Sequence, residues 1–269
     1  MGKPRYHRRR ICCMLGLSAK EAGIMLQVQN IEKYYGSQNQ VTKALDRVSF
    51  TVEDGAFIAI MGASGSGKTT LVKLMLGFYT PGKGSIRLGE TPLGMINPHL
   101  WRAKSGAVMQ DGFIFSDTIA NNIAVGTEQP DIERLRHAVS VANIREFIDS
   151  LPLGYNTRIG MEGNGLSQGQ KQRLLIARAV YKNPEFLFFD EATNALDANN
   201  EKEIMEHLHE FYRGKTVVVV AHRLSTVRDA DKIVVLDKGK VAEEGTHREL
   251  TEKRGLYYRL VKNQLELGN

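Results

Sequence analysis

The sequence predicts an α/β fold in which helices flank a mostly parallel sheet, with an antiparallel β portion and an inserted α-helical sub-domain. Short apolar runs without alternation suit strands buried on both faces of a parallel sheet. Such runs occur once before residue 62 and three times after residue 185, at Phe57–Met61, Phe186–Phe189, Val217–Val220 and Ile233–Leu236. Residues 112–183 instead have helical periodicity, whereas residues 26–60 alternate apolar and polar side chains.

Residues 26–60 are expected to form strands joined as a hairpin. In the first run, Leu26, Val28 and Asn30 fall on one face, and Val48–Val52 alternates again. Asp54-Gly55 is a tight-turn dipeptide before the central strand. Residues 85–89 form another expected strand, after a Pro-Gly-Lys-Gly turn. In the helical part, Asp131 is a candidate N-cap.

The stretch from Gly62 to Thr69 has the spacing G-x-x-x-x-G-K-[ST] of a loop that wraps nucleotide phosphates. Glycines allow the backbone N–H groups to approach the phosphates, and Lys68 supplies a cation for the β- and γ-oxygens. The Thr69 hydroxyl is expected in a Mg²⁺ shell. The strand before this loop and the helical spacing of Leu71, Leu74, Met75 and Phe78 after it favour a nucleotide site over a chance Gly/Ser-rich turn. The predicted core is therefore that of a P-loop NTPase, with these cofactor-binding residues: Gly62, Ala63, Ser64, Gly65, Ser66, Gly67, Lys68, Thr69 and Thr70.

The formal net charge of +6 is concentrated in the first 25 residues, which hold six basic side chains and one acidic one. The rest of the 269 residues carries 30 basic and 29 acidic side chains, which argues against a nucleic-acid-binding face. We expect residues 1–25 to be a disordered tail, or an extension in front of a true start at Met25. A short transit peptide is the alternative. Adjacent Cys12 and Cys13 suggest neither a disulfide nor a metal site. No window reaches the roughly 18 apolar residues of a membrane span, so a membrane role would need a partner.

Two carboxylates, Asp190 and Glu191, follow the apolar run Phe186–Phe189. In a P-loop fold such a strand delivers Asp190 to the Mg²⁺ shell, while Glu191 can polarise an attacking water. An apolar run before Asp-Glu is by itself a common strand end. Its position downstream of a phosphate loop favours the functional interpretation.

Leu166-Ser167-Gln168-Gly169-Gln170 has capping-box spacing and opens an expected helix. It also resembles the signature of the ABC ATPase family, which is usually Leu-Ser-Gly-Gly-Gln, with Gln168 as the one departure. The resemblance implies that Ser167 and Gly169 meet the γ-phosphate of ATP held on another subunit, with Gln170 beside them. An exposed helix N-terminus has free N–H groups for such an anion.

The resemblance extends over residues 26–262, which implies one ABC ATPase domain at 26–265 with a helical sub-domain at about 112–183. Tyr35 matches the aromatic residue that stacks on adenine, with Tyr34 as the alternative. Gln110 matches a loop glutamine that touches Mg²⁺ and faces the membrane partner. The remaining matches are Asp197, in the loop joining the two sites, and His222, which holds the γ-phosphate. Residues 160–163 resemble an exporter loop that faces the transmembrane domain.

Different parts of the chain resemble different subgroups of the ABC ATPase family. Residues 113–123, 244–247 and 255–257 look like the ATPase half of peptide and multidrug exporters, which is normally fused to six membrane helices. Residues 43–64 look more like the free-standing ATPases of macrolide-efflux and lipoprotein-release systems. One hypothesis is that the reading frame joins two such genes near the phosphate loop.

The resemblance implies an ATP- and Mg²⁺-dependent ATPase that powers export as a head-to-tail homodimer or paired half. The catalytic residues would be Glu191, His222, Lys68 and Gln110. A permease on another chain would hold it at the cytoplasmic face of the plasma (inner) membrane, and no nucleic acid would be bound. A DNA-repair ATPase is disfavoured because residues 71–165 lack long heptad arms, and a translation-associated protein because it would carry two ATPase halves. A non-functional fragment is a third alternative.

Overall fold

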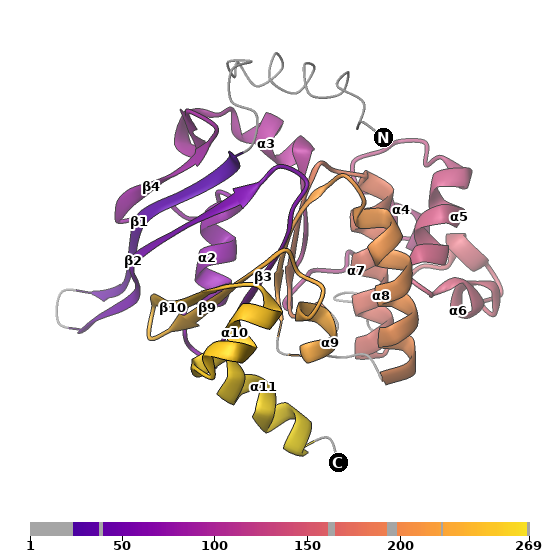
Figure 1. Cartoon of the computed structure of the whole chain (residues 1–269). Helices are drawn as coiled ribbons and strands as arrows, with labels where there is room; N and C mark the ends of the chain where they lie inside the picture. The colour runs from indigo at the N-terminus through magenta and orange to yellow at the C-terminus, as the bar shows by residue number, and fades with distance from the viewer. Residues whose placement is uncertain (1–23, 38–39, 161–164, 193–197, 222, 268–269) are drawn as a thin grey trace, which may run out of the picture. The chain divides into compact units, whose positions relative to one another are not determined.

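The computed structural model describes residues 24–37, 40–160, 165–192, 198–221 and 223–267 (Figure 1). They belong to two compact units. Unit 1 is drawn from residues 1–104 and 216–269, and unit 2 from residues 105–215. Within the described ranges, every helix is too short or too polar to cross a membrane.

Unit 1 contains an antiparallel sheet with the strand order β2-β1-β4-β5. Figure 1 labels β2, β1 and β4 of this sheet. Its strands are β1 (Ile24–Ser37), β2 (Gln40–Glu53), β4 (Lys83–Leu88) and β5 (Thr91–Pro92). The expected hairpin is confirmed, since β1 pairs antiparallel with β2. The turn before the next strand is also confirmed, because Ala56 N–H donates to Glu53 O at 3.1 Å and Gly55 has φ 72°.

The alternation expected for the first strand is right as far as Val28 and wrong beyond it. Leu26 and Val28 are buried, but Asn30 is exposed and Ile31 is fully buried. The pairing with β2 shifts register between Val28 and Ile31, so a bulge exchanges the two faces of the strand. Asn30 has φ 49°, in the left-handed region that asparagine tolerates better than most residues.

The second group of strands in unit 1 has the order β10-β9-β3-β8. It comprises β3 (Phe57–Gly62), β8 (Thr216–Val220), β9 (Lys232–Asp237) and β10 (Lys240–Gly245). Strand β3 pairs in parallel with both β8 and β9, whereas β10 is antiparallel to β9. Every residue of β8 is buried, as are five of the six in β3. The non-alternating apolar runs therefore form buried parallel strands, as predicted.

The helix expected after the phosphate loop is confirmed, but it is shorter than the spacing predicts. Helix α2 (Lys68–Met75) buries Leu71, Leu74 and Met75, whereas Phe78 lies outside it and is 54% exposed. The helix is terminated by Gly77, which follows the C-cap Leu76 and has φ 74°. There the N–H of Phe78 donates to Lys73 O at 2.9 Å and the N–H of Gly77 to Leu74 O at 3.0 Å, the paired bonds of a Schellman cap. The other helices of unit 1 are η1 (Leu93–Met95), α3 (Pro98–Lys104), α9 (Leu224–Val227), α10 (His247–Lys253) and α11 (Leu256–Leu267).

Unit 2 combines two parallel strands, β6 (Ser105–Val108) and β7 (Phe186–Asp190), with a group of helices. Its long helix α7 (Gln168–Lys182) packs against α5, α4 and β6. Asp131 caps α5 as expected, because its Oδ1 accepts the N–H groups of Glu133 at 2.9 Å and Arg134 at 3.1 Å. The remaining helices are α4 (Ile119–Ile123), α5 (Ile132–Val141), α6 (Arg145–Asp149), η2 (Gly154–Asn156) and α8 (Ala198–Tyr212).

Candidate functional site

The phosphate loop, Gly62–Thr70, connects the end of β3 with the first turn of α2 in unit 1. Gly67 is the N-cap of α2 and has φ 100°, a left-handed conformation that favours glycine. A Cβ at this position would lie 2.6 Å from the backbone oxygen of Ala44 and 2.7 Å from Leu45 Cδ2. Strand β2 therefore packs so closely behind the loop that only glycine fits there.

Two polar side chains inside the loop fit an anionic ligand. Lys68 is 5% exposed, and its Nζ donates at 2.9 Å to each of the carbonyl oxygens of Gly62 and Ala63. The loop's own backbone thus fixes the position of the ammonium group. Ser66 is 3% exposed, and its Oγ has no hydrogen-bond partner among the described residues. A buried hydroxyl left unpaired is costly, which favours occupation of the loop by a ligand with acceptor oxygens.

The turn between β9 and β10 is hydrogen-bonded to the phosphate loop. The N–H of Gly239 donates to Ser66 O at 3.2 Å, and the N–H of Asp46 donates to Gly239 O at 2.7 Å. Hydrogen bonds from Lys43 and from Lys240 lower the pKa of the Asp46 carboxyl to about 2. The carboxylate is therefore ionised at physiological pH and balances two cations beside the loop.

Of the two adjacent candidate tyrosines, Tyr35 is the one with a contact to the phosphate loop. Its hydroxyl donates to Thr70 Oγ1 at 3.4 Å, and its ring, 38% exposed, meets Tyr79 edge to face at 6.0 Å. The Tyr34 hydroxyl instead donates to the carboxylate of Glu32. Tyr35 thus offers an exposed aromatic surface next to the loop.

In unit 2, the candidate acid residues lie at one edge of the β6–β7 pair. The two strands are parallel, and Val108 is opposite Phe189. Because parallel strands share their carboxyl edge, Gln110, Asp190 and Glu191 all follow at that edge. Asp190 is the last residue of β7 and is 1% exposed. Glu191 has φ 53°, which is uncommon for a residue with a side chain.

The signature-like stretch forms the N-terminus of α7. Ser167 Oγ accepts the N–H of Gln170 at 3.2 Å, and Gln170 Oε1 accepts the N–H of Ser167 at 2.8 Å, so the predicted capping box is confirmed. Ser167 is exposed and Gly169 lies in the first turn. The Gln170 amide oxygen is therefore occupied by the capping box, whereas the Ser167 side of the helix N-terminus faces solvent.

Sequence reasoning missed Gln172, which is 7% exposed on α7. Its Nε2 donates to the backbone oxygen of Glu191 at 3.2 Å. The available signal was its spacing, because Gln172 precedes the buried Leu175 and Ile176 by three and four residues and so shares their inward face. Two predicted residues, Asp197 and His222, lie outside the described residues, as does most of the stretch 160–163.

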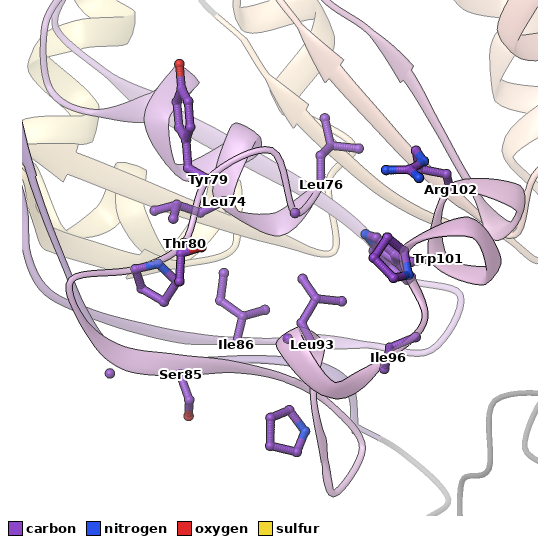
Figure 2. A pocket seen from close by; sticks show the side chains of 16 residues that line it. Leu74, Leu76, Tyr79, Thr80, Ser85, Ile86, Leu93, Ile96, Trp101 and Arg102 are labelled. Atoms are coloured by element: carbon purple, nitrogen blue, oxygen red, sulfur yellow. The ribbon is translucent and has the colours of Figure 1, made fainter.

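A separate cavity of about 290 Å³ lies at the far end of α2 from the phosphate loop. Figure 2 shows Ile86 and Leu93 pointing into the space between Leu74 and Trp101. The Trp101 indole N–H donates to Met75 O at 3.2 Å, so it is already hydrogen-bonded within the protein. An apolar lining of this kind does not suit a triphosphate, which carries several negative charges. The phosphate loop, and not this cavity, is therefore the candidate nucleotide site.

Comparison with known proteins places these features in a family. Residues 45–194 match the family model described as "ABC transporter". The chain is 46% identical over 226 residues to the ATP-dependent lipid A-core flippase of Saccharophagus degradans, covering 84% of this chain and 39% of that protein. It is 44% identical over 223 residues to the Toxin RTX-I translocation ATP-binding protein of Actinobacillus pleuropneumoniae, covering 82% of this chain and 32% of that one.

A solved structure gives the same result for the fold. The structure titled "Structure of a bacterial Atm1-family ABC exporter with ATP bound" matches with a TM-score of 0.84 and 38% identity, covering 90% of this chain and 42% of that chain. The predicted fold class is confirmed by this match. The chain spans less than half the length of the flippase, the toxin translocation protein and the exporter. These matches do not support the separate likeness of residues 43–64, and a joined gene stays a prediction.

Proposed function

Because the chain belongs to the ABC transporter family, we propose that it binds and hydrolyses ATP and that this cycle powers export through a transmembrane partner. The observation that carries the proposal is the phosphate loop. Its backbone positions the buried Lys68 ammonium and turns at Gly67 directly into the N-terminus of α2. A helix N-terminus, backbone N–H groups and a fixed cation together favour a polyphosphate.

Within one subunit, the loop would hold the β- and γ-phosphates of ATP, with Lys68 as their cation and Tyr35 against the adenine. Thr69, Gln110 and Asp190 would hold Mg²⁺, since oxygen donors are what this ion prefers. When bound there, Mg²⁺ would supply positive charge that offsets the negative charge of the phosphates. The buried Asp190 carboxylate and the unpaired Ser66 hydroxyl support such a site in their respective units.

For hydrolysis, Glu191 would accept the proton of the attacking water, and His222 would hold the γ-phosphate. Phosphoryl transfer needs little covalent chemistry from the protein, so positioning and charge stabilisation carry most of the catalysis. The left-handed backbone at Glu191, which follows directly on the buried Asp190, supports this division of roles. Strained backbone of this kind is concentrated at functional sites.

We further propose that two copies, or this chain and a related ATPase half, bind two ATP molecules head to tail. Ser167 and Gly169 of one subunit would meet the γ-phosphate held by the loop of the other. The exposure of Ser167 at an open helix N-terminus supports this role, because its N–H groups and dipole favour an anion. Binding would close the dimer, and hydrolysis would reopen it.

A transmembrane partner at the cytoplasmic face of the membrane would turn this cycle into transport. Exposed aromatic residues in unit 2 support a protein contact close to Gln110. Phe113 is 52% exposed and Phe115 44% exposed, and their rings meet edge to face at 5.1 Å. Large exposed apolar side chains gathered in one place mark interaction sites.

The test separates binding from turnover with Glu191→Gln. The amide keeps the size of the carboxylate but cannot act as a base, so hydrolysis should slow by about 10²–10⁴-fold while ATP stays bound. The variant should therefore accumulate as an ATP-dependent dimer, which size-exclusion chromatography with light scattering detects with and without Mg-ATP.

A second substitution tests the shared site. Adding Ser167→Arg should dissolve that dimer without preventing ATP binding to the loop, because it places bulk and charge against the γ-phosphate. Ser140→Arg, at an exposed position of α5 in the same unit, is the matched control and should leave the dimer intact. A dimer that persists with ATP after Ser167→Arg would contradict the head-to-tail site.

A further inference from the structure

Gln172 connects the signature helix with the backbone of Glu191 inside unit 2. The side chain is 7% exposed on α7, and its Nε2 lies 3.2 Å from the Glu191 carbonyl oxygen. Buried amides are hydrogen-bonded because an unpaired one is costly. The proposed function uses Ser167 and Glu191 but gives Gln172 no role.

The carbonyl that Gln172 holds belongs to the residue with the unusual backbone. Glu191 has φ 53°, a left-handed conformation that is unfavourable for a residue with a Cβ. A hydrogen bond to its carbonyl fixes the plane of the following peptide group, and hence the ψ angle of Glu191. Because φ and ψ determine where the side chain leaves the backbone, this bond limits the directions available to the carboxylate.

Gln172 also lies on the same helix as the residues proposed to contact ATP on the other subunit. It is five residues from Ser167, which is about 7.5 Å along a helix that rises 1.5 Å per residue. Near this position α7 is anchored a second time, because Arg173 Nη1 donates to Asn143 O at 2.8 Å. Because Gln172 and Ser167 lie on one continuous helix, a displacement of the helix N-terminus would move the Gln172 amide with it.

We propose, on the basis of the proposed function, that Gln172 is a positioning residue for Glu191. Its amide holds the Glu191 carbonyl so that the carboxylate keeps the direction needed to accept a proton from water. It also links the end of α7 that meets the partner's ATP to the base that acts on the subunit's own ATP. Closure of one site thereby orients the base of the other.

Gln172→Met tests this role because methionine has a similar length and flexibility but no donor. We expect kcat for ATP hydrolysis to fall about 3–10-fold, the range for loss of one neutral hydrogen bond. The KM for ATP should stay within about twofold of the wild-type value. The Hill coefficient for ATP should fall towards 1. Lys182→Met, at an exposed position of the same helix, is the control and should change none of these values.

A purely structural role predicts a different result. If the amide only satisfied a buried carbonyl, Gln172→Met would lower the melting temperature and reduce turnover by the same factor in any background. In our proposal Gln172 acts through the carboxylate, so adding Gln172→Met to Glu191→Gln should cause no further loss of the residual turnover. Equal losses in both backgrounds would overturn the proposal, as would a kcat for Gln172→Met within twofold of wild type.

Two further outcomes are distinguishable. If Gln172→Met does not fold, Gln172→Asn keeps a buried amide with a shorter reach, and it should lower kcat without raising KM. Wild-type protein that binds ATP but does not hydrolyse it would overturn the proposed function and this inference together. Active wild-type protein with unaffected Gln172 variants would overturn this inference alone.

Discussion

The phosphate loop of unit 1 and the Asp190–Glu191 stretch of unit 2 both carry residues proposed to act on ATP, but different interactions hold them. In the loop, Lys68 is fixed by the carbonyl oxygens of Gly62 and Ala63, which lie six and five residues away. In unit 2, the backbone oxygen of Glu191, the proposed base, accepts a hydrogen bond from Gln172 of α7, nineteen residues away in sequence. One arrangement is local and the other depends on the packing of a helix against a strand.

This difference has a functional consequence. Because the loop fixes its own cation, we expect it to keep its shape without a second subunit and to bind ATP alone. Glu191, the proposed base after β7, is hydrogen-bonded to α7, so we expect its orientation to depend on what α7 contacts. We therefore expect substitutions in the phosphate loop to have large effects that do not depend on a second subunit. Substitutions around the loop should have smaller effects.

The largest effect is expected from Lys68→Ala, which tests whether the loop acts alone. Charge-assisted hydrogen bonds contribute about 1.5–3 kcal/mol each, so losing two or more to the phosphates should weaken ATP binding by about 10²–10⁴-fold. Calorimetric titration with Mg-ATP measures the change. Lys73→Ala, at the other end of α2, is the control and should bind ATP normally. Wild-type affinity in Lys68→Ala would contradict the assignment of this loop.

An intermediate effect is expected from Gly67→Ala, which tests how far the loop depends on its neighbours. The new Cβ would meet the Ala44 carbonyl oxygen at 2.6 Å and would also strain a backbone with φ 100°. Strain and overpacking each cost about 1–3 kcal/mol, so the free energy of unfolding should fall by roughly 2–4 kcal/mol.

Gly65→Ala is the matched control for this substitution. Gly65 has φ 75°, but a Cβ there meets nothing within 4 Å, so only the backbone strain of about 1–2 kcal/mol applies. Chemical denaturation of both variants gives the difference. Equal losses would mean that the packing of β2 behind the loop contributes nothing to stability.

The same contrast explains what could be predicted from the sequence. The phosphate loop, the buried parallel strands and the capping box at Ser167 follow from spacing within a few residues, and the structure has them where they were expected. The exposure of Asn30 and the burial of Ile31 depend on a bulge against β2, which no pattern within one strand contains. Gly77 indicates that α2 ends early, but the apolar spacing that continues to Phe78 predicts a longer helix. Gln172 was missed because its partner lies on another element, and the catalytic roles of the site residues stay predictions.

The smallest effect is expected from Tyr35→Ala, which tests how far the nucleotide site extends beyond the loop. Stacking of a base on an aromatic ring contributes about 1–3 kcal/mol, and the ring is partly exposed, so ATP affinity should fall by about 5–30-fold. Tyr34→Ala is the neighbouring control, because its hydroxyl contacts Glu32 and not the loop, and it should change the affinity by less than about twofold. Tyr35→Phe should also bind normally, since the hydroxyl contact with Thr70 is long at 3.4 Å and the ring is kept. If Tyr34→Ala weakens binding and Tyr35→Ala does not, the adenine lies on the other tyrosine. The contact with Thr70 would then be only part of the packing around the loop.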